Sequence, residues 1–393
     1  MIVQKKTVKR TGADIRKAIE SNWKEYLSRY GNLFSSNHVD GSTPPSVFVG
    51  SYGYPKVLVG PMLPPIHGDT AILDSPEKWV GKSLEDIVNY RLSLIRGIKP
   101  VKIQDVGQKY IESLQEMTMS ERPTDAQMEL VKNAAPAVTV DGDSPIFGPI
   151  GEIKSATFSN SSSDKQIQKS YYDKDLLASD AIVGLYNKGI EISKIQKCFS
   201  IGMFGKDRKL VPTRWSITAT DDIVSKALVE QIVDYDLLDT TLIFSYNHLG
   251  NYFCVIMFPS RWMFEMQEAW YDEQGNVGFG SDFEDIRGMT HYPETAGAHF
   301  ASRLAVSEYL VEHKSQAAAM VLREIRPEYA VPVGVWQVRE GVRMALKQKP
   351  IIVQNFLEGL DNACKALSIG KNEWLAHSKL YQAKKQKSIS DFF

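Results

Sequence analysis

The 393-residue sequence contains little cysteine and no long apolar run. Its three cysteines, Cys198, Cys254 and Cys364, are far apart, and none lies in a CxxC pair. This spacing argues against both a disulfide framework and a structural zinc site. No apolar run approaches the roughly 18–20 residues that cross a bilayer, and the first residues lack an apolar secretory segment. We therefore expect a cytoplasmic protein without a membrane partner.

An excess of charge of one sign is also absent. The 46 lysines and arginines nearly balance the 47 acidic residues, which leaves a net charge of −1. A global basic field that attracts nucleic acid is therefore excluded, and any DNA contact must come from a local patch. An apolar content of 43% is ordinary for a globular protein, and the length suits two or three domains.

The last eight residues, QKSISDFF, form a distinct pattern. Residues three apart eclipse one another in a 3₁₀ turn, so Ile389 and Phe392 would share one side with Phe393 beside them. Gln386 supplies a polar group at the start of this hydrophobic plug. Burying the three apolar side chains stabilises a contact by about 1.5–3 kcal/mol each, whereas ordering the chain costs about 1–2 kcal/mol per residue. The balance suits a reversible contact of roughly micromolar affinity.

This pattern resembles the PCNA-interacting peptide, by which replication and repair proteins attach to the sliding clamp. All four of its defining positions are present: Gln386, Ile389, Phe392 and Phe393. The resemblance implies that PCNA is a partner. We expect residues 379–393 to form a flexible tail.

The remaining chain predicts an α+β fold, with mixed or antiparallel sheets and packed helices. Apolar runs at 47–49 and 57–59 predict a hairpin, and so do the runs within 241–258. Helical patterns occur at 83–95, 104–119, 124–134 and 296–313. Strands and helices do not alternate regularly, as they would in a parallel sheet. The organisation we expect is a flexible basic arm at 1–12, an N-terminal region at 13–280 and a C-terminal region at 281–378, with the boundary placed at the glycine-rich stretch 275–281.

The most distinctive internal stretch, residues 204–222, combines basic residues with one tryptophan. Such a cluster suits phosphate contacts together with base stacking. Alternation from Thr213 to Ala219 predicts a strand that places Arg214, Ser216 and Thr218 on one side. The residues that we expect to contact DNA are Lys206, Arg208, Lys209, Arg214 and Trp215.

Four stretches resemble the archaeal Nre family of DNA repair proteins. They are SVFVGSYGYPKVLVGPMLPP at 46–65, FGPIGEIK at 147–154, LVPTRWSITATDD at 210–222 and PEYAVPVGVWQVREGVR at 327–343. The resemblance extends from about residue 30 to 350 and implies a clamp-associated, nucleoid-associated archaeal repair factor with an N-terminal and a C-terminal Nre region. Many relatives carry a cysteine-rich segment at the start, which this sequence lacks, so no zinc is implied. The family supplies no catalytic residues to transfer.

Whether the protein is an enzyme stays open. Glu152 and Lys154 share one face of an expected strand, and Asp221 and Asp222 follow the LVPTRWSIT stretch. Together they are candidates for a metal-dependent nuclease that holds Mg²⁺ or Mn²⁺. An ordinary ion pair and a helix N-terminus explain the same residues. The alternatives are a non-enzymatic adaptor that binds DNA or another repair protein and, less strongly supported, a nucleobase-modifying enzyme that uses His248.

Overall fold

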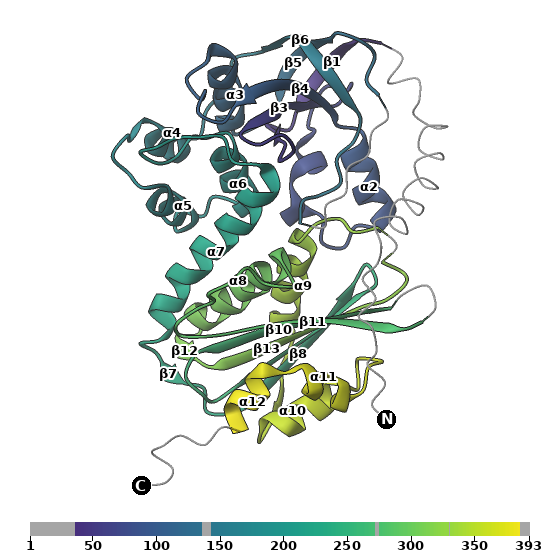
Figure 1. Ribbon diagram of the computed structural model, residues 1–393, viewed down its shortest axis with the longest axis vertical. Coiled ribbons are helices and arrows are strands. Elements are labelled where there is room, and N and C mark those ends of the chain that lie inside the picture. The colour runs from purple at the N-terminus through teal and green to yellow at the C-terminus, as the bar shows by residue number, and fades with distance from the viewer. Residues whose placement is uncertain (1–35, 136–142, 272–274, 330, 386–393) are drawn as a thin grey trace. The chain divides into compact units, whose positions relative to one another are not determined.

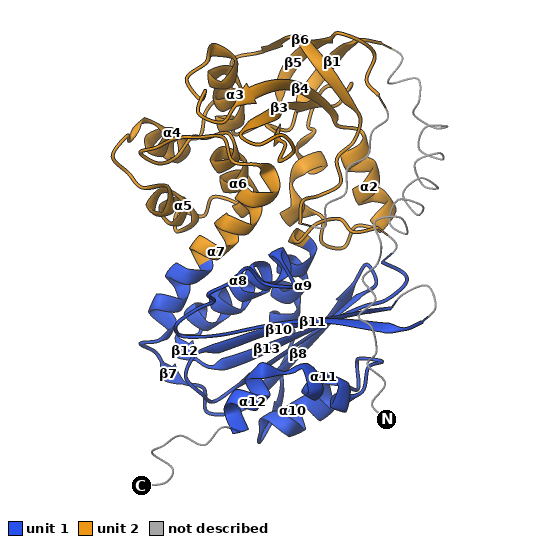
Figure 2. Ribbon diagram, in the orientation of Figure 1, with its two compact units in different colours: residues 1–16, 225–330, 337–393 blue, residues 17–224, 331–336 orange. Residues whose placement is uncertain are grey.

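The computed structural model describes residues 36–135, 143–271, 275–329 and 331–385 (Figure 1). The chain forms two compact units, which Figure 2 colours separately. Unit 2 comprises residues 17–224 and 331–336, and unit 1 comprises residues 1–16, 225–330 and 337–393. The arm expected at 1–12 and the motif at 386–393 lie outside the described residues.

Unit 2 is built on a six-stranded mixed sheet. In strand order it consists of β1 (His38–Thr43), β5 (Thr124–Leu130), β6 (Ile150–Phe158), β4 (Ile95–Lys102), β3 (Lys56–Leu63) and β2 (Val47–Val49). Strands β4 and β6 are parallel, and the other neighbours in this sheet are antiparallel. Phe48 of β2 lies opposite Gly60 of β3, which confirms the first expected hairpin.

Strand β5 replaces the helix expected at 124–134. Its side chains alternate between buried Thr124, Ala126 and Met128 and exposed Asp125 and Gln127. Such a period of two is typical of a strand with one solvent-facing side. Alanine, glutamine, methionine and glutamate favour helices in isolation, but the pairing of this segment with β1 and β6 overrides that preference.

Unit 2 also contains helices, some between its strands in the sequence and the others after β6. They are α2 (Leu84–Leu92), α3 (Lys109–Met119), α4 (Lys165–Tyr172), α5 (Ala178–Tyr186), α6 (Ile192–Ser200) and the first part of α7 (Thr213–Ile232), with the 3₁₀ helices η2 (Ala71–Asp74) and η3 (Pro76–Lys78). Helix α2 begins at a capping box, in which Ser83 Oγ accepts a hydrogen bond from the Asp86 N–H at 3.1 Å. Helix α6 buries Ile192, Ile195 and Cys198 at three-residue spacing together with the polar Ser193, Gln196 and Ser200, which leaves Lys194 and Lys197 half-buried.

Unit 1 is built on a second six-stranded mixed sheet. Its strand order is β11 (Val277–Asp285), β10 (Met263–Tyr271), β13 (Ala318–Ile325), β9 (Asn251–Phe258), β8 (Thr241–His248) and β14 (Ile351–Val353). Strands β10 and β13 are parallel, and β8 and β9 form the second expected hairpin. Two short parallel strands, β7 (Asp236–Leu237) and β12 (Ser315–Gln316), pair separately.

Helices cover both faces of the unit 1 sheet (Figure 1). Helices α8 (Gly297–Glu312) and α9 (Trp336–Leu346) lie on one face, and α10 (Phe356–Ala363), α11 (Lys371–His377) and α12 (Lys379–Lys385) lie on the other. Phe356, Leu360 and Trp374 pack with Ile256 and Met320 of the sheet in one hydrophobic cluster. Two sheets with helices packed against them confirm the predicted α+β class.

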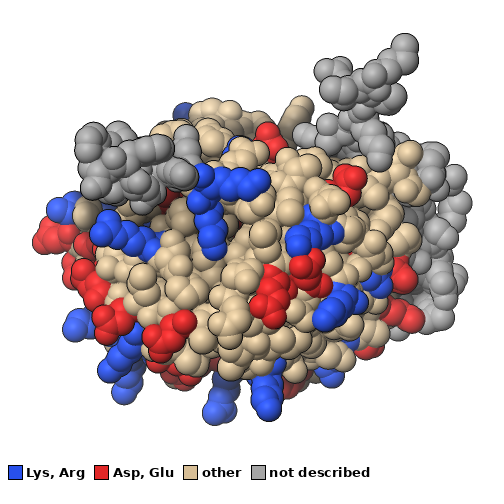
Figure 3. Space-filling view, turned by 90° about the horizontal axis from the view of Figure 1, so that it is seen from below, with Lys and Arg blue, Asp and Glu red and all other residues tan. Residues whose placement is uncertain are grey.

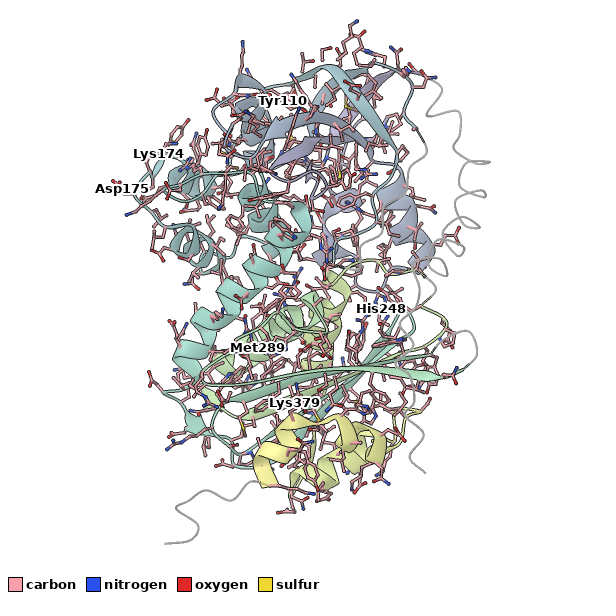
Figure 4. All side chains as sticks on the ribbon, in the orientation of Figure 1. Tyr110, Lys174, Asp175, His248, Met289 and Lys379 are labelled. Atoms are coloured by element: carbon pink, nitrogen blue, oxygen red, sulfur yellow. The ribbon has the colours of Figure 1, made fainter. Side chains whose placement is uncertain are left out.

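A buried carboxylate of β10 holds the beginning of α12. Glu265 accepts hydrogen bonds from the backbone N–H groups of Lys379 at 2.6 Å and Leu380 at 3.2 Å, and from Ser378 Oγ at 2.6 Å. Figure 4 labels Lys379, the first residue of α12, next to the sheet. Residues 379–385, expected within the flexible tail, therefore belong to the folded body, because Leu380 is buried and Glu265 caps the helix.

The expected boundary near residue 280 lies inside β11, whereas the compact units divide within α7. The glycines that suggested a break are needed for side-chain packing. A Cβ atom at Gly278 would lie 2.6 Å from the Trp270 ring on β10. Residues 275 and 276 therefore lead into β11, and residues 277–281 are part of this strand.

Among the described residues, no helix is long and apolar enough to cross a membrane.

Candidate nucleic-acid interface

The stretches that carry the family resemblance meet in unit 2. Arg214 Nη2 donates to Asp143 Oδ2 at 2.6 Å, and the Asp143 carbonyl accepts from the Val335 N–H at 3.0 Å. Thr213 Oγ1 accepts from the Val49 N–H at 3.0 Å. The 46–65, 210–222 and 327–343 stretches are thus connected through side chains and backbone near Arg214.

A cavity of about 40 Å³ lies beside these contacts. Three of the stretches contribute to its lining, through residues such as Val47, Phe147 and Ser216. Segments that are far apart in the chain therefore enclose one small region of unit 2.

A buried ion cluster lines the same cavity. The Asp74 carboxylate forms hydrogen bonds with the Arg91 guanidinium and the Ser46 hydroxyl, and one of its oxygens lies 3.0 Å from Lys197 Nζ. Burial opposes ionisation of Asp74, but the positive charges of Arg91 and Lys197 outweigh it and keep the pKa of this carboxyl below its ordinary value. The cluster fixes the positions of η2, α2 and α6 beneath the surface.

The FGPIGEIK stretch accepts hydrogen bonds from a second buried arginine, Arg96. The Gly148 carbonyl accepts hydrogen bonds from Arg96 Nε at 3.1 Å and Nη2 at 2.9 Å. A Cβ atom at Gly148 would lie 2.9 Å from the carbonyl oxygens of Arg91, Leu92 and Leu94. Only glycine fits at this position, so this stretch of the family motif shapes the framework of the site.

Three aromatic side chains of the 46–65 and 210–222 stretches are exposed. The exposed fractions are 92% for Tyr52, 45% for Tyr54 and 43% for Trp215. The rings of Tyr54 and Trp215 have centroids 5.2 Å apart and are tilted by 56°. An exposed tryptophan supported by a tyrosine offers a face for an unpaired base.

Exposed lysines occur in the chain segments that adjoin Tyr54 and Trp215. Lys56 of β3 lies opposite Lys102 of β4. The Ile103 N–H donates to the Pro55 carbonyl at 3.0 Å, and the Leu210 N–H donates to the Ile103 carbonyl at 2.8 Å. The loop between β2 and β3, which carries Tyr52 and Tyr54, is therefore adjacent to the end of β4 and to the loop before α7. We call the resulting area the aromatic–basic surface, and it consists of Tyr52, Tyr54, Lys56, Lys102, Lys206, Lys209, Arg214 and Trp215.

The five residues expected to contact DNA have different environments. Lys206, Lys209 and Trp215 are exposed, as such contacts require. Arg208 is instead an anchor, because its Nη2 donates to the carbonyls of Tyr171 at 2.7 Å and Asp173 at 3.1 Å. These bonds hold the chain between α4 and α5, where Figure 4 shows Lys174 and Asp175 at the edge of unit 2. Arg214 is partly exposed but ion-paired with Asp143.

The strand expected from Thr213 to Ala219 is wrong, because the segment forms the first turns of α7. Pro212 precedes it, and its carbonyl accepts hydrogen bonds from the Trp215 and Ser216 N–H groups, both at 2.9 Å. The buried side chains recur at helical spacing: Ser216, Ile217, Thr220, Asp221 and Val224. Since three of these five are small or polar, the apolar pattern did not reveal the helix. Arg214 and Trp215 thus lie on its exposed side, whereas Ser216 and Thr218 are buried.

The four candidate catalytic residues also have separate environments. Glu152 and Lys154 are exposed on β6, and Lys154 Nζ pairs with Glu129 Oε1 of β5 at 2.7 Å. Asp221 is fully buried and accepts a hydrogen bond from Gln196 Nε2 at 3.2 Å, while Asp222 is half-buried. Figure 1 shows β6 at the end of unit 2 opposite to α7. Within the described part of the chain, no group of three or more His, Cys, Asp or Glu side chains could hold a metal ion.

Sequence reasoning missed the tyrosines and two of the lysines of this surface. Tyr52 and Tyr54 appear in the sequence as part of a Gly/Pro-punctuated hairpin loop. Two aromatic residues in such a loop were a usable signal, because a loop cannot bury them easily. Their proximity to Trp215 depends on tertiary contacts that the sequence does not reveal.

Unit 1 presents surfaces of a different character. On the face in Figure 3, at the end that carries α10 to α12, Lys and Arg side chains are interspersed with Asp and Glu. His248 lies at the end of β8, with its ring centroid 6.3 Å from that of Tyr246 (Figure 4). A surface of mixed charge suits DNA less well than the aromatic–basic surface of unit 2.

Comparison with known proteins gives consistent matches along the chain. The family model described as "Archaeal Nre, N-terminal" matches residues 16–274, and "Archaeal Nre, C-terminal" matches residues 284–392. Two proteins of Archaeoglobus fulgidus, named DNA repair protein NreA and DNA repair protein NreB, are 40% and 37% identical to the chain. The alignments cover 89% of this chain and 89% of NreA, and 90% of this chain and 91% of NreB. DNA repair protein NreA of Haloferax volcanii is 32% identical, over 93% of this chain and 92% of its own length. No solved structure gives a significant match.

Proposed function

Because the chain belongs to the archaeal Nre family, we propose that it is a DNA repair factor that binds unpaired DNA through the aromatic–basic surface. The observation that carries this proposal is the exposed Tyr54–Trp215 ring pair, with exposed lysines in the adjoining segments. The similar proteins of Archaeoglobus and Haloferax are named as DNA repair proteins. Repair exposes unpaired bases, which are the groups that such rings bind.

The chemistry of the surface suits the binding of single-stranded DNA without sequence preference. Stacking of one base on an aromatic ring contributes about 1–3 kcal/mol. Exposed lysines that neutralise phosphates add affinity that weakens with salt, by a slope of about −0.7 per phosphate on a single strand. The basic candidates are Lys56, Lys102, Lys206, Lys209 and Arg214. Since the net charge of the chain is −1, this local cluster has to supply the attraction.

We propose further that the QKSISDFF motif attaches the protein to PCNA. The proposal rests on the residue pattern of Gln386, Ile389, Phe392 and Phe393. The motif directly follows α12, whose beginning is held on unit 1 by Glu265. A bound clamp would therefore be connected to the folded body through very few intervening residues. DNA binding by unit 2 and clamp binding by the motif use separate parts of the chain.

The environments of the candidate catalytic residues favour the adaptor over the metal-dependent nuclease. Lys154 is engaged with Glu129, and Asp221 is buried. A two-metal site needs carboxylates that converge on two ions about 3.5–4 Å apart. Glu152, Asp221 and Asp222 stay the nuclease candidates that a cleavage assay has to test.

One experiment separates these functions. The full chain is mixed with labelled single-stranded, duplex and branched DNA, with and without Mg²⁺ or Mn²⁺, and both anisotropy and products are measured. The adaptor predicts binding that is tightest for unpaired DNA, with no products. Metal-dependent products that disappear in the Asp221→Ala, Asp222→Ala variant would establish the nuclease instead. Equal, weak affinity for all three DNAs would contradict the proposed surface.

A further inference from the structure

Unit 2 carries a polar groove of about 280 Å³ that the proposed DNA surface does not use. It lies between the chain after α3, the η2–η3 segment and the beginning of α6. Its charged lining residues are Lys78, Glu121, Arg122, Asp164, Glu191, Lys194 and Lys197. The volume is close to the lower end of the range for small-molecule sites.

Lys194 of α6 contributes an amine to this groove. Its side chain is half-buried, and Nζ donates a hydrogen bond to the Ser120 carbonyl at the C-terminus of α3, at 2.6 Å. Lys197 is the other lysine of α6 in the groove, but its Nζ is held by the Asp74 carbonyl at 2.6 Å and the Asp74 carboxylate at 3.0 Å. Lys197 is therefore ion-paired with Asp74, whereas Lys194 Nζ donates to a neutral carbonyl.

The groups around Lys194 determine its protonation. Burial lowers the pKa of the Lys194 ammonium to about 8, and the charge of Lys197 acts in the same direction. Cys198, Asp164 and Glu191 oppose this effect. At pH 7.5 about a quarter of an amine with this pKa is neutral, against about one in a thousand for an ordinary lysine. Neutral amines are the form that attacks carbonyl carbons.

We propose that Lys194 forms an imine with an aldehyde that carries a neighbouring phosphate. Under the proposed repair function, on which this choice of substrate rests, the aldehyde is the ring-opened deoxyribose at an abasic site in DNA. Lys78 and Arg122 line the groove and supply positive charge for the phosphate. Lys78 lies in η3 and Arg122 in the chain after α3, so the positive charge comes from two segments of the groove lining.

The reaction balances with groups of the groove. The Lys194 nitrogen attacks the aldehyde carbon, one of its two protons passes to the carbonyl oxygen, and a carbinolamine forms. Glu191 or Asp164, the carboxylates next to Lys194, transfers the remaining amine proton to the carbinolamine hydroxyl. Water leaves, and a carbon–nitrogen double bond remains. No oxidant or reductant is consumed.

The same lysine could have a purely structural role, because its contact with Ser120 also satisfies a helix C-terminal carbonyl. Chemical reactivity distinguishes the two roles. Pyridoxal 5′-phosphate, an aldehyde with a phosphate, serves as a probe that does not depend on DNA binding. The full chain is treated with this probe and borohydride, and the modified lysines are located by peptide mass spectrometry.

We expect Lys194 to be the first lysine modified, with a yield that rises between pH 7 and pH 9. The Lys194→Arg variant keeps a hydrogen-bond donor at this position, so we expect its melting temperature to stay near that of wild type. At low probe concentration we expect its labelling to fall at least tenfold. Lys197→Arg is the matched control on the same helix and keeps the adduct at Lys194. Labelling spread over surface lysines, or unchanged in Lys194→Arg, would overturn the inference.

A second arm tests the DNA substrate. An oligonucleotide with one abasic site is incubated with the chain and sodium cyanoborohydride, with an intact oligonucleotide as control. A covalent complex that maps to Lys194 supports the assignment. Reaction with pyridoxal phosphate but not with abasic DNA would overturn the DNA assignment. Neither failure alters the affinity of the aromatic–basic surface for DNA, which is measured separately by anisotropy.

Discussion

Replacing Trp215 with alanine removes the tryptophan face of the aromatic–basic surface. The ring is 43% exposed, and Tyr54 supports it at a centroid distance of 5.2 Å. A stacked base contributes about 1–3 kcal/mol, and less than half of this ring is free, so we expect the lower half of that range. A loss of about 1–2 kcal/mol corresponds to a roughly 5- to 30-fold weaker Kd. Fluorescence anisotropy with a labelled oligothymidine at fixed salt measures this change.

The matched control is Tyr292→Ala in unit 1, which removes a side chain that is 61% exposed. Its Kd should equal that of wild type, and both variants should melt within a few degrees of wild type because neither ring is buried. An unchanged Kd in Trp215→Ala, or an equal loss in Tyr292→Ala, would refute the assignment of the surface.

Substitutions at three other sites should have measurable effects. Lys206→Ala with Lys209→Ala should reduce the slope of log affinity against log salt by about 1.4, because two phosphate contacts are lost; an unchanged slope in a salt titration would remove these lysines from the interface. Asp74→Asn should lower the free energy of unfolding by about 3–5 kcal/mol, because Arg91 and Lys197 keep buried charges without a counter-ion. Since the pKa of Asp74 is lowered in the folded state, its contribution is present above the unfolded value and declines as the pH falls through the folded one. Denaturant titrations should thus show the difference from wild type shrinking in strong acid, and a loss below 1 kcal/mol at pH 7 would contradict the account. Phe392→Ala with Phe393→Ala should abolish calorimetric binding to PCNA while the melting temperature stays unchanged, and retained binding would show that the motif is not the attachment point.

The sequence predicts well those elements whose pattern is set by local residues. The hairpins at 47–63 and 241–258 and the helix α8 are confirmed, since alternating or three-to-four spacing of apolar residues specifies them directly. The first turns of α7 were missed because Ser216, Thr220 and Asp221 are polar yet buried. Their burial is decided by packing within unit 2, which the pattern of apolar residues does not encode.

Part of the candidate site could also be predicted, because a local cluster of residues marks it in the sequence. Lys206, Lys209 and Trp215 stand out as a basic cluster beside a tryptophan and are exposed as expected. Arg208 has the same residue type, but its hydrogen bonds to Tyr171 and Asp173 make it part of the fold. Tyr54 joins the site only because backbone hydrogen bonds bring Pro55, Ile103 and Leu210 together over more than 150 residues of chain.

We propose that unpaired DNA lies on the aromatic–basic surface of unit 2. Photocrosslinking of the full chain to a single-stranded oligonucleotide that contains bromouracil, followed by peptide mapping, tests it most directly. We expect crosslinks at Tyr52, Tyr54 or Trp215, and we expect duplex DNA of the same length to be a poor competitor for them. Crosslinks confined to other peptides, with these three residues unmodified, would contradict it.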